Sequence, residues 1–176
     1  GVTLSGSSSF SGSIDPQTSQ MAEFSFSFDN YTVASGNDSF SCSGSIAFDL
    51  SALSQTASVN MYLKDGSTDE VYRLENFVMS ATDYSSYVEM AITSGNFYHP
   101  DYGYIALATT APFQTNFSED WPSAGRLVCT GETGPAGGPT KAILTVFSPT
   151  EYQIEADTNG DGTYDYNSGV LLWSNV

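Results

Sequence analysis

Hydrophobic and polar residues alternate with a period of two along most of the chain. In residues 24–28 phenylalanine alternates with serine, and in residues 57–64 apolar residues alternate with polar ones. Neighbouring residues of a β-strand point to opposite faces, so this alternation predicts strands with one apolar and one polar face. An antiparallel sheet tolerates a solvated face far better than a parallel sheet does.

Turn-forming residues interrupt the alternation at short intervals. Typical breaks are Asp65-Gly66 and Ser148-Pro149, and no stretch has a convincing helical period. Short connections pair sequential strands, which predicts a meander. We therefore expect one all-β domain over residues 1–176: an antiparallel, meander-rich β-sandwich or barrel of about a dozen strands with almost no helix.

Several local features follow from the same pattern. One helical turn is expected, at residues 51–56, and every proline is expected between strands. The longest irregular stretches are expected at residues 111–125 and 131–139. The core is expected from the apolar positions of the alternating runs: Phe24, Phe26, Phe28, Ile46, Phe48, Val59, Met61, Leu63, Leu144, Val146 and Leu172.

The chain is strongly acidic and rich in hydroxyl side chains. Lys and Arg number 4 against 20 Asp and Glu, which gives a net charge of −16. Such a surface repels phosphate backbones and anionic lipid, so no nucleic-acid partner is expected. No apolar run approaches the roughly 20 residues of a membrane helix, so no transmembrane segment is expected in this chain. Abundant serine and threonine with little lysine indicate a secreted or surface-exposed bacterial protein.

The sharpest local motif is A-D-T-N-G-D-G-T-Y-D, residues 156–165. Oxygen-bearing side chains at alternate positions, followed by glycine, are typical of calcium loops, which makes Asp157, Asn159, Asp161 and Asp165 candidate calcium ligands. The match is partial, because Ser168 stands where such loops carry a bidentate glutamate. Asn-Gly and Asp-Gly are also strong hairpin-turn dipeptides, so a turn without metal is the alternative.

Catalytic chemistry has little support in the sequence. His99 is the only histidine, it precedes Pro100 in a turn-like segment, and no G-x-S-x-G motif is present, so a Ser–His–Asp triad is not expected. Strand acids such as Glu75, Glu89 and Glu151 supply carboxylates for glycoside hydrolysis, but nothing singles out a buried pair.

Aromatic residues beside polar neighbours are candidates for binding sugars by stacking. Tyr98, Tyr102 and Trp121 are the candidate ligand-binding residues, and Tyr104 and Trp173 have similar surroundings. Cross-strand packing of aromatic rings is the alternative for all of them.

Cys42 and Cys129 are the only cysteines, and both share strand parity with apolar neighbours. Both are therefore expected to point inward. A disulfide and two buried free thiols fit this pattern equally well. The absence of C-x-x-C and of a Cys/His cluster makes structural zinc implausible.

Beyond about residue 70 the chain contains a series of distinctive segments: Y-R-L-E-N-F, F-Y-H-P-D-Y-G-Y, W-P-S-A-G-R-L-V, K-A-I-L-T, Y-Q-I-E-A-D-T-N-G-D-G-T-Y-D and L-L-W-S. In this order they resemble an uncharacterised family of bacterial envelope lipoproteins, over about residues 70–176. The resemblance implies export and a lipidated cysteine upstream of this chain, and no established activity. The segment 131–139 is longer here than the family's usual turn.

These observations together predict a non-enzymatic secreted or envelope-anchored β module, periplasmic or extracellular and stabilised by calcium. Its expected partner is a protein or a glycan at the cell surface. The alternative is an extracellular hydrolase acting on polysaccharide, or a carbohydrate-binding module. A buried acidic pair in a cleft would favour the hydrolase, and a flat aromatic patch without such a cleft would favour the non-enzymatic β module. A purely structural spacer, the third possibility, would show neither.

Overall fold

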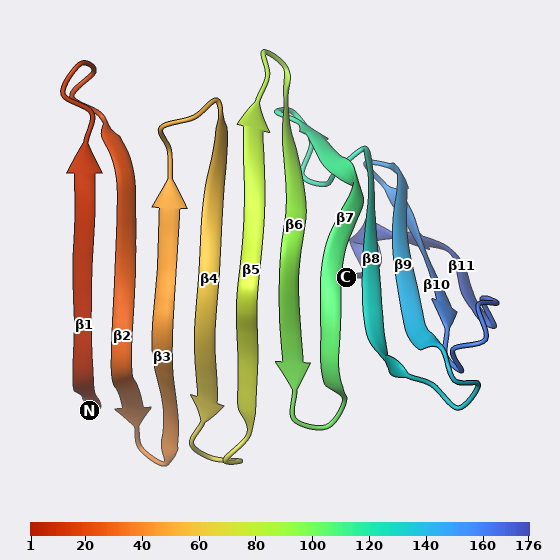
Figure 1. Cartoon of the computed structure of the whole chain (residues 1–176), viewed down its shortest axis with the longest axis horizontal. Coiled ribbons are helices and arrows are strands. Elements are labelled where there is room, and N and C mark those ends of the chain that lie inside the picture. Colours follow the sequence, from red (N-terminus) through yellow and green to blue (C-terminus); the bar gives the residue numbers. More distant parts are fainter.

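A computed structural model describes the whole chain, Gly1–Val176, as eleven strands and one short 3-10 turn (Figure 1). Most strands are long because the period-two alternation runs through ten or more residues before a turn interrupts it. The elements are β1 (Val2–Ile14), β2 (Met21–Ser35), β3 (Asp38–Asp49), β4 (Ser54–Asp65), β5 (Val71–Asp83), β6 (Tyr87–His99), β7 (Gly103–Asn116), β8 (Ala124–Thr133), β9 (Pro139–Ser148), β10 (Glu151–Asp157), β11 (Tyr166–Leu172) and η1 (Trp173–Asn175).

Each strand pairs in antiparallel fashion with the strands before and after it in sequence, so all eleven form one sheet in the order β1 to β11. The all-β class, the antiparallel meander and the near absence of helix are thus confirmed. The first and last strands do not pair, so the sheet is not closed into a barrel. Figure 1 shows β1–β6 side by side, with the strands from β7 onward turning away and the C-terminus lying behind them.

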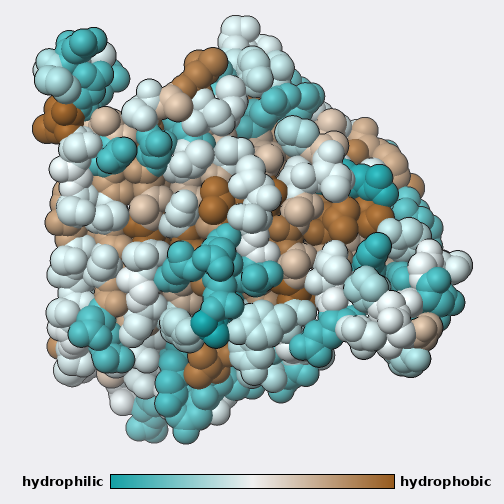
Figure 2. Space-filling model, in the orientation of Figure 1, coloured by the Kyte–Doolittle hydropathy of each residue, from teal (hydrophilic) through white to brown (hydrophobic).

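The two faces of the sheet differ in chemistry. Residues opposite each other in register share a face, and one row runs Phe10, Phe26, Ile46, Val59 and Phe77 across β1 to β5. We call the side that carries this row the apolar face. The opposite side, the polar face, carries mostly serine, threonine, asparagine and charged residues over β1–β6. In Figure 2, hydrophilic side chains gather over the middle strands.

No second layer covers most of the apolar face. Only 8 of 176 residues are buried, and the buried apolar side chains are Cys42, Met61, Ile143 and Val146. Of the expected core residues, only Met61 and Val146 are buried in this sense. Phe26 remains 38% exposed and Leu172 45% exposed, so a buried position was the wrong expectation for these two.

The apolar face is covered locally near the C-terminus. Trp173, in η1, stacks on Tyr152 of β10 with ring centroids 4.0 Å apart. Trp121, from the β7–β8 loop, stacks on Trp173 at 4.9 Å, with the two rings nearly parallel. This three-ring stack lies beside Val146, which is the register partner of Tyr152 and is buried.

Several expected element boundaries were wrong. β7 continues to Asn116 and contains Pro112, so the loop before β8 is shorter than expected, and β9 begins at Pro139, so two prolines belong to strands. The strand pairing near Pro112 is irregular, which is where a residue without an N–H group is tolerated. The segment at residues 51–56 forms no helix, since β4 begins at Ser54.

The cysteines are both free and point inward, as the alternation predicted, but they do not form a disulfide. Cys42 lies on β3 and Cys129 on β8, with four strands of the sheet between them. Burial raises the pKa of both thiols, which favours their protonated form.

Candidate binding surface

The motif that resembles a calcium loop forms the connection between β10 and β11. Asp157, the last residue of β10, is 2% exposed, and its two carboxylate oxygens accept the backbone N–H groups of Gly160 at 2.7 Å and Gly162 at 2.8 Å. Asn159 accepts the N–H group of Asp161 in the same way at 2.8 Å. These side chains therefore fold the turn by satisfying its own backbone donors.

Asp165 closes the turn from its far side. It accepts the N–H group of Thr158 at 3.0 Å and the Thr158 hydroxyl at 2.8 Å. These two bonds hold the pKa of Asp165 below its ordinary value. Residues 163–165 lie outside the strands, because β11 begins at Tyr166.

The acidic turn is braced by the loop between β8 and β9. The N–H group of Ala136 donates to the Asn159 carbonyl at 2.9 Å, and that of Gly138 donates to the Gly160 carbonyl at 3.0 Å. A side chain at Gly160 would meet the Gly138 carbonyl at 2.0 Å, so the close approach requires glycine. The segment 131–139 and the acidic motif at residues 156–165 thus form one ordered unit.

The four candidate calcium ligands lie in one turn, but each carboxylate is used for backbone hydrogen bonds. No group of three or more His, Cys, Asp or Glu side chains in the chain is placed to share a metal ion. Each carboxylate oxygen retains a second lone pair, so hydrogen bonding alone does not occupy the potential ligands. Calcium binding at this turn remains a prediction.

The three candidate ligand-binding aromatics lie in three separate places. Tyr102 is 82% exposed in the β6–β7 turn, with its ring centroid 4.6 Å from that of His99. Trp121 is 40% exposed and belongs to the stack with Trp173. Tyr98 lies on β6, on the polar face. They do not form one platform.

Tyr98 belongs instead to a continuous row across the polar face, which we call the tyrosine–arginine row. Tyr62, Arg73, Tyr98 and Tyr104 are register partners on four adjacent strands, β4 to β7. The Arg73 guanidinium carbon lies 4.5 Å from the centre of the Tyr62 ring, and Arg73 donates from Nη1 to the Tyr104 hydroxyl at 2.9 Å. The rings of Tyr98 and Tyr104 lie 4.9 Å apart.

Glu75 completes the row by forming an ion pair with Arg73 from the same side of β5. The Arg73 Nε atom is buried and has no hydrogen-bond partner, which is a cost in stability. Tyr62, at the end of the row, is 45% exposed. The row therefore offers a partly exposed aromatic ring, which has the Arg73 guanidinium over one face, beside charged and hydroxyl groups that are held in fixed positions.

Sequence reasoning named Tyr98 and Tyr104 but missed Tyr62 and Arg73. The available signal was strand parity, because Tyr62 alternates with Met61 and Leu63 and must lie on the polar face. A large aromatic residue on a solvated face is more informative than one on the apolar face.

One pair of acids faces a shallow depression on the polar face of β1–β4. Glu23 and Asp49 are register partners on β2 and β3, and both line it. The Ser51 hydroxyl and backbone N–H group both donate to Asp49 and lower its pKa. A carboxylate kept ionised in this way is poorly suited to act as a general acid.

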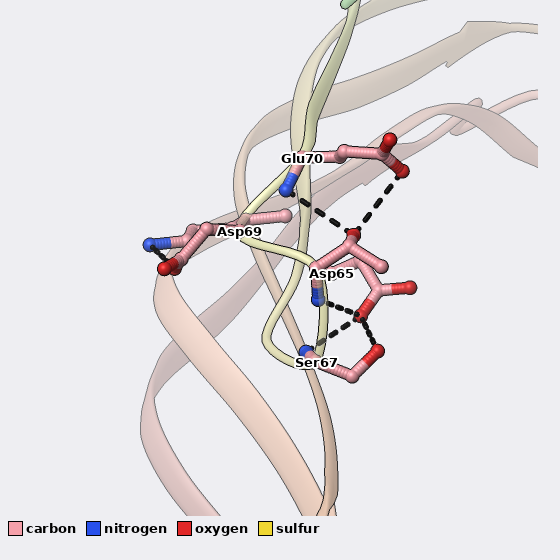
Figure 3. A network of polar contacts seen from close by, with 6 residues as sticks. Asp65, Ser67, Asp69 and Glu70 are labelled. Carbon is pink, nitrogen blue, oxygen red and sulfur yellow. Dashed lines mark hydrogen bonds and ion pairs between the residues drawn. The ribbon is translucent and has the colours of Figure 1, made fainter.

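A second turn with an acidic residue shows how this chain closes its hairpins. Asp65, at the end of β4, accepts the Ser67 N–H group at 2.7 Å and the Ser67 hydroxyl at 2.6 Å (Figure 3). Asp69 pairs with Lys64 at 2.7 Å, and both side chains are largely exposed. These contacts explain why acidic residues occur in this turn without requiring a bound ligand.

No protein-family model, no curated protein and no solved structure matches this chain. The chain contains no helix with the length and apolar character that a membrane-spanning segment requires.

Proposed function

We propose that this chain is a non-enzymatic binding module of the bacterial envelope or extracellular space, and that it binds a neutral glycan through the tyrosine–arginine row. The observation that carries the proposal is the in-register row of Tyr62, Arg73, Tyr98 and Tyr104 on the polar face. Four adjacent strands place these groups along a line across the sheet, which suits an extended ligand better than a compact one.

The chemistry of the row fits a sugar chain. Sugar rings present apolar C–H faces that pack on aromatic rings, and their hydroxyls form hydrogen bonds with charged groups. Arg73 is neutralised by Glu75, and the chain carries a net charge of −16, which disfavours an acidic polysaccharide. The ligand class supported best is therefore a neutral glycan.

The proposed setting rests on composition and resemblance. Few lysines, many hydroxyl side chains and the segments that resemble envelope lipoproteins favour an exported protein attached through an upstream lipid anchor. In that setting the turn between β10 and β11 meets calcium, and we propose that calcium stabilises it through Asp157, Asn159, Asp161 and Asp165.

The proposal is tested by isothermal titration of the 176-residue chain with soluble β-glucan, xylan and mannan oligosaccharides. Replacement Tyr62→Ala is expected to weaken binding about tenfold, because it removes the most exposed ring of the row. The matched control is Tyr166→Ala on β11, where the tyrosine is 51% exposed against 45% for Tyr62 but is not in the row.

Two results would contradict the proposal: no binding of any neutral glycan, or equal binding by the Tyr62→Ala variant. Release of reducing ends from the same glycans would instead favour the hydrolase. That activity should then be lost in an Asp49→Asn variant, since Glu23 and Asp49 are the acids that line the depression on the polar face.

A further inference from the structure

The apolar face over β1–β6 carries an aromatic cluster that nothing covers. Phe24 stacks on Phe48 with ring centroids 4.5 Å apart, and Phe10 lies 5.1 Å from Phe26. Despite these contacts Phe10 remains 56% exposed and Phe26 38% exposed. Exposed apolar surface on this scale marks an interaction site in soluble proteins.

The accessible surface area of the chain indicates how much surface a partner could cover. The chain exposes 10499 Å². A folded monomer of its mass is expected to expose about 8300 Å², so the excess is about 2200 Å². Permanent homodimers bury roughly 1000–2500 Å² on each subunit, so one further copy of the chain suffices to remove this excess.

The distribution of charge fits a dry contact between identical faces. Over β1–β6 the register places only Asp38, Asp65 and Asp83 on the apolar face, and each lies at the end of its strand. The remaining acids of these strands lie on the polar face or in turns. Two apolar faces can therefore meet without burying a charge in the middle of the contact.

We propose that two copies of this chain pack their apolar faces together over β1–β6, related by a twofold axis, as the two layers of a β-sandwich. Sheets pack about 10 Å apart in this way, and a twofold axis brings the same patch of each copy together. The three-ring stack of Trp121, Trp173 and Tyr152 already occupies the apolar face at the other end of the sheet, so the contact is limited to β1–β6.

This arrangement leaves both polar faces on the outside. Each dimer then presents two tyrosine–arginine rows on opposite sides, so that it can hold two glycan chains at once. The dimer itself does not depend on the proposed glycan binding, because the two surfaces lie on opposite faces of the sheet.

Sedimentation velocity of the 176-residue chain over a hundredfold range of concentration tests the dimer. The wild-type chain is expected to be dimeric at micromolar concentration. Replacement Phe26→Asp should shift it to monomer, because it places a charge in the contact. The matched control is Ser27→Asp, which adds the same charge to the next residue of β2, on the polar face, and should leave the dimer intact.

A second variant guards against a folding defect, and the salt dependence tests the charge repulsion between the two copies. Phe10→Ser changes a residue that is 56% exposed on the outermost strand, and it should weaken the dimer at least tenfold while circular dichroism stays unchanged. Higher sodium chloride should tighten the dimer, since it screens the repulsion between two copies of charge −16.

A monomer at every concentration would overturn the proposal, as would a dimer that persists in a folded Phe26→Asp variant. A monomer that binds phosphatidylcholine vesicles through Phe10 and Phe26 would also overturn it, and would assign the apolar face to lipid.

Discussion

The two ends of the sheet have the same strand chemistry but different surroundings. At the N-terminal end, all 13 residues of β1 are exposed, including four apolar ones. At the C-terminal end, Val146 of β9 is buried, and a three-ring stack covers the apolar face beside it. The difference comes from the segments outside the strands, since the chain folds back over the sheet only near β8–β10.

This contrast separates the formation of a sheet from the formation of a core. Backbone pairing and alternation are sufficient to place β1 beside β2, with registered pairs along nearly its whole length. Burial requires a second layer, which the C-terminal end obtains from Trp121 and Trp173. The N-terminal end has no such segment among these 176 residues, and the proposed dimer supplies its second layer.

Removing the stack should produce the largest loss of stability. Trp173→Ala takes away the middle ring between Trp121 and Tyr152 and should lower the free energy of unfolding by about 2–4 kcal/mol, measured by urea denaturation. Phe117→Ala, at a side chain that is 65% exposed in the same loop as Trp121, should have little effect.

The conservative variant Trp173→Phe sharpens this experiment. The indole nitrogen of Trp173 is buried without a hydrogen-bond partner, so phenylalanine keeps most of the stacking and loses no hydrogen bond. A loss as large as that of alanine would show that the stack does not act through ring contact, and the contrast between the two ends would then need another cause.

The acidic turn near the C-terminal end should give the next largest effect. Asp157→Asn replaces a buried carboxylate that accepts two N–H groups, and should cost about 1–3 kcal/mol without calcium and more in its presence. Asp161→Ala removes a candidate ligand that lies on the exposed side of the turn, and should cost less in the absence of metal.

The same thermal unfolding series tests calcium binding. A site of extracellular affinity is expected to raise the melting temperature by roughly 3–8 °C in 10 mM calcium, and the Asp161→Ala variant should lose that rise. Magnesium at equal concentration controls for general screening of the net charge. If the two ions shift the melting temperature equally, or not at all, the turn has no specific calcium site and is held only by the backbone hydrogen bonds already described.

The sequence was sufficient for most of the fold because alternation and turn residues are local signals. They identified the antiparallel meander, the inward direction of Cys42 and Cys129, and the calcium-like turn at residues 157–165. They did not reveal that Phe26 stays partly exposed, because alternation says which face a residue joins and not whether another layer covers that face. The stack of Trp121 on Trp173 joins residues far apart in sequence, for which no local signal exists.

The candidate site was found only in part for a related reason. Tyr98 was named for its aromatic ring, but its partners Tyr62 and Arg73 follow from strand register, and register depends on bulges such as the one between Glu75 and Val78. Asn76, inside that bulge, has a φ angle of 48°, and asparagine tolerates such a conformation better than most residues.

The smallest expected effect concerns the hairpin turns of the N-terminal end and depends on pH. Donation by the Ser67 hydroxyl and backbone N–H groups holds the pKa of Asp65 below its ordinary value of 3.8. Because the folded state binds this proton less readily than the unfolded state, the Asp65 carboxylate stabilises the fold above pH 3.8 and loses that contribution as the pH falls through its folded-state pKa. Asp65→Asn should therefore melt roughly 1–2 °C below wild type at pH 7, and the difference should shrink as the pH falls below 3.8. Asp69→Asn, in the same turn, makes the same change in net charge and leaves the Ser67 bonds in place. If both variants lose the same stability with the same pH dependence, the effect belongs to the net charge, and the Asp65 turn contributes nothing of its own to the N-terminal end of the sheet.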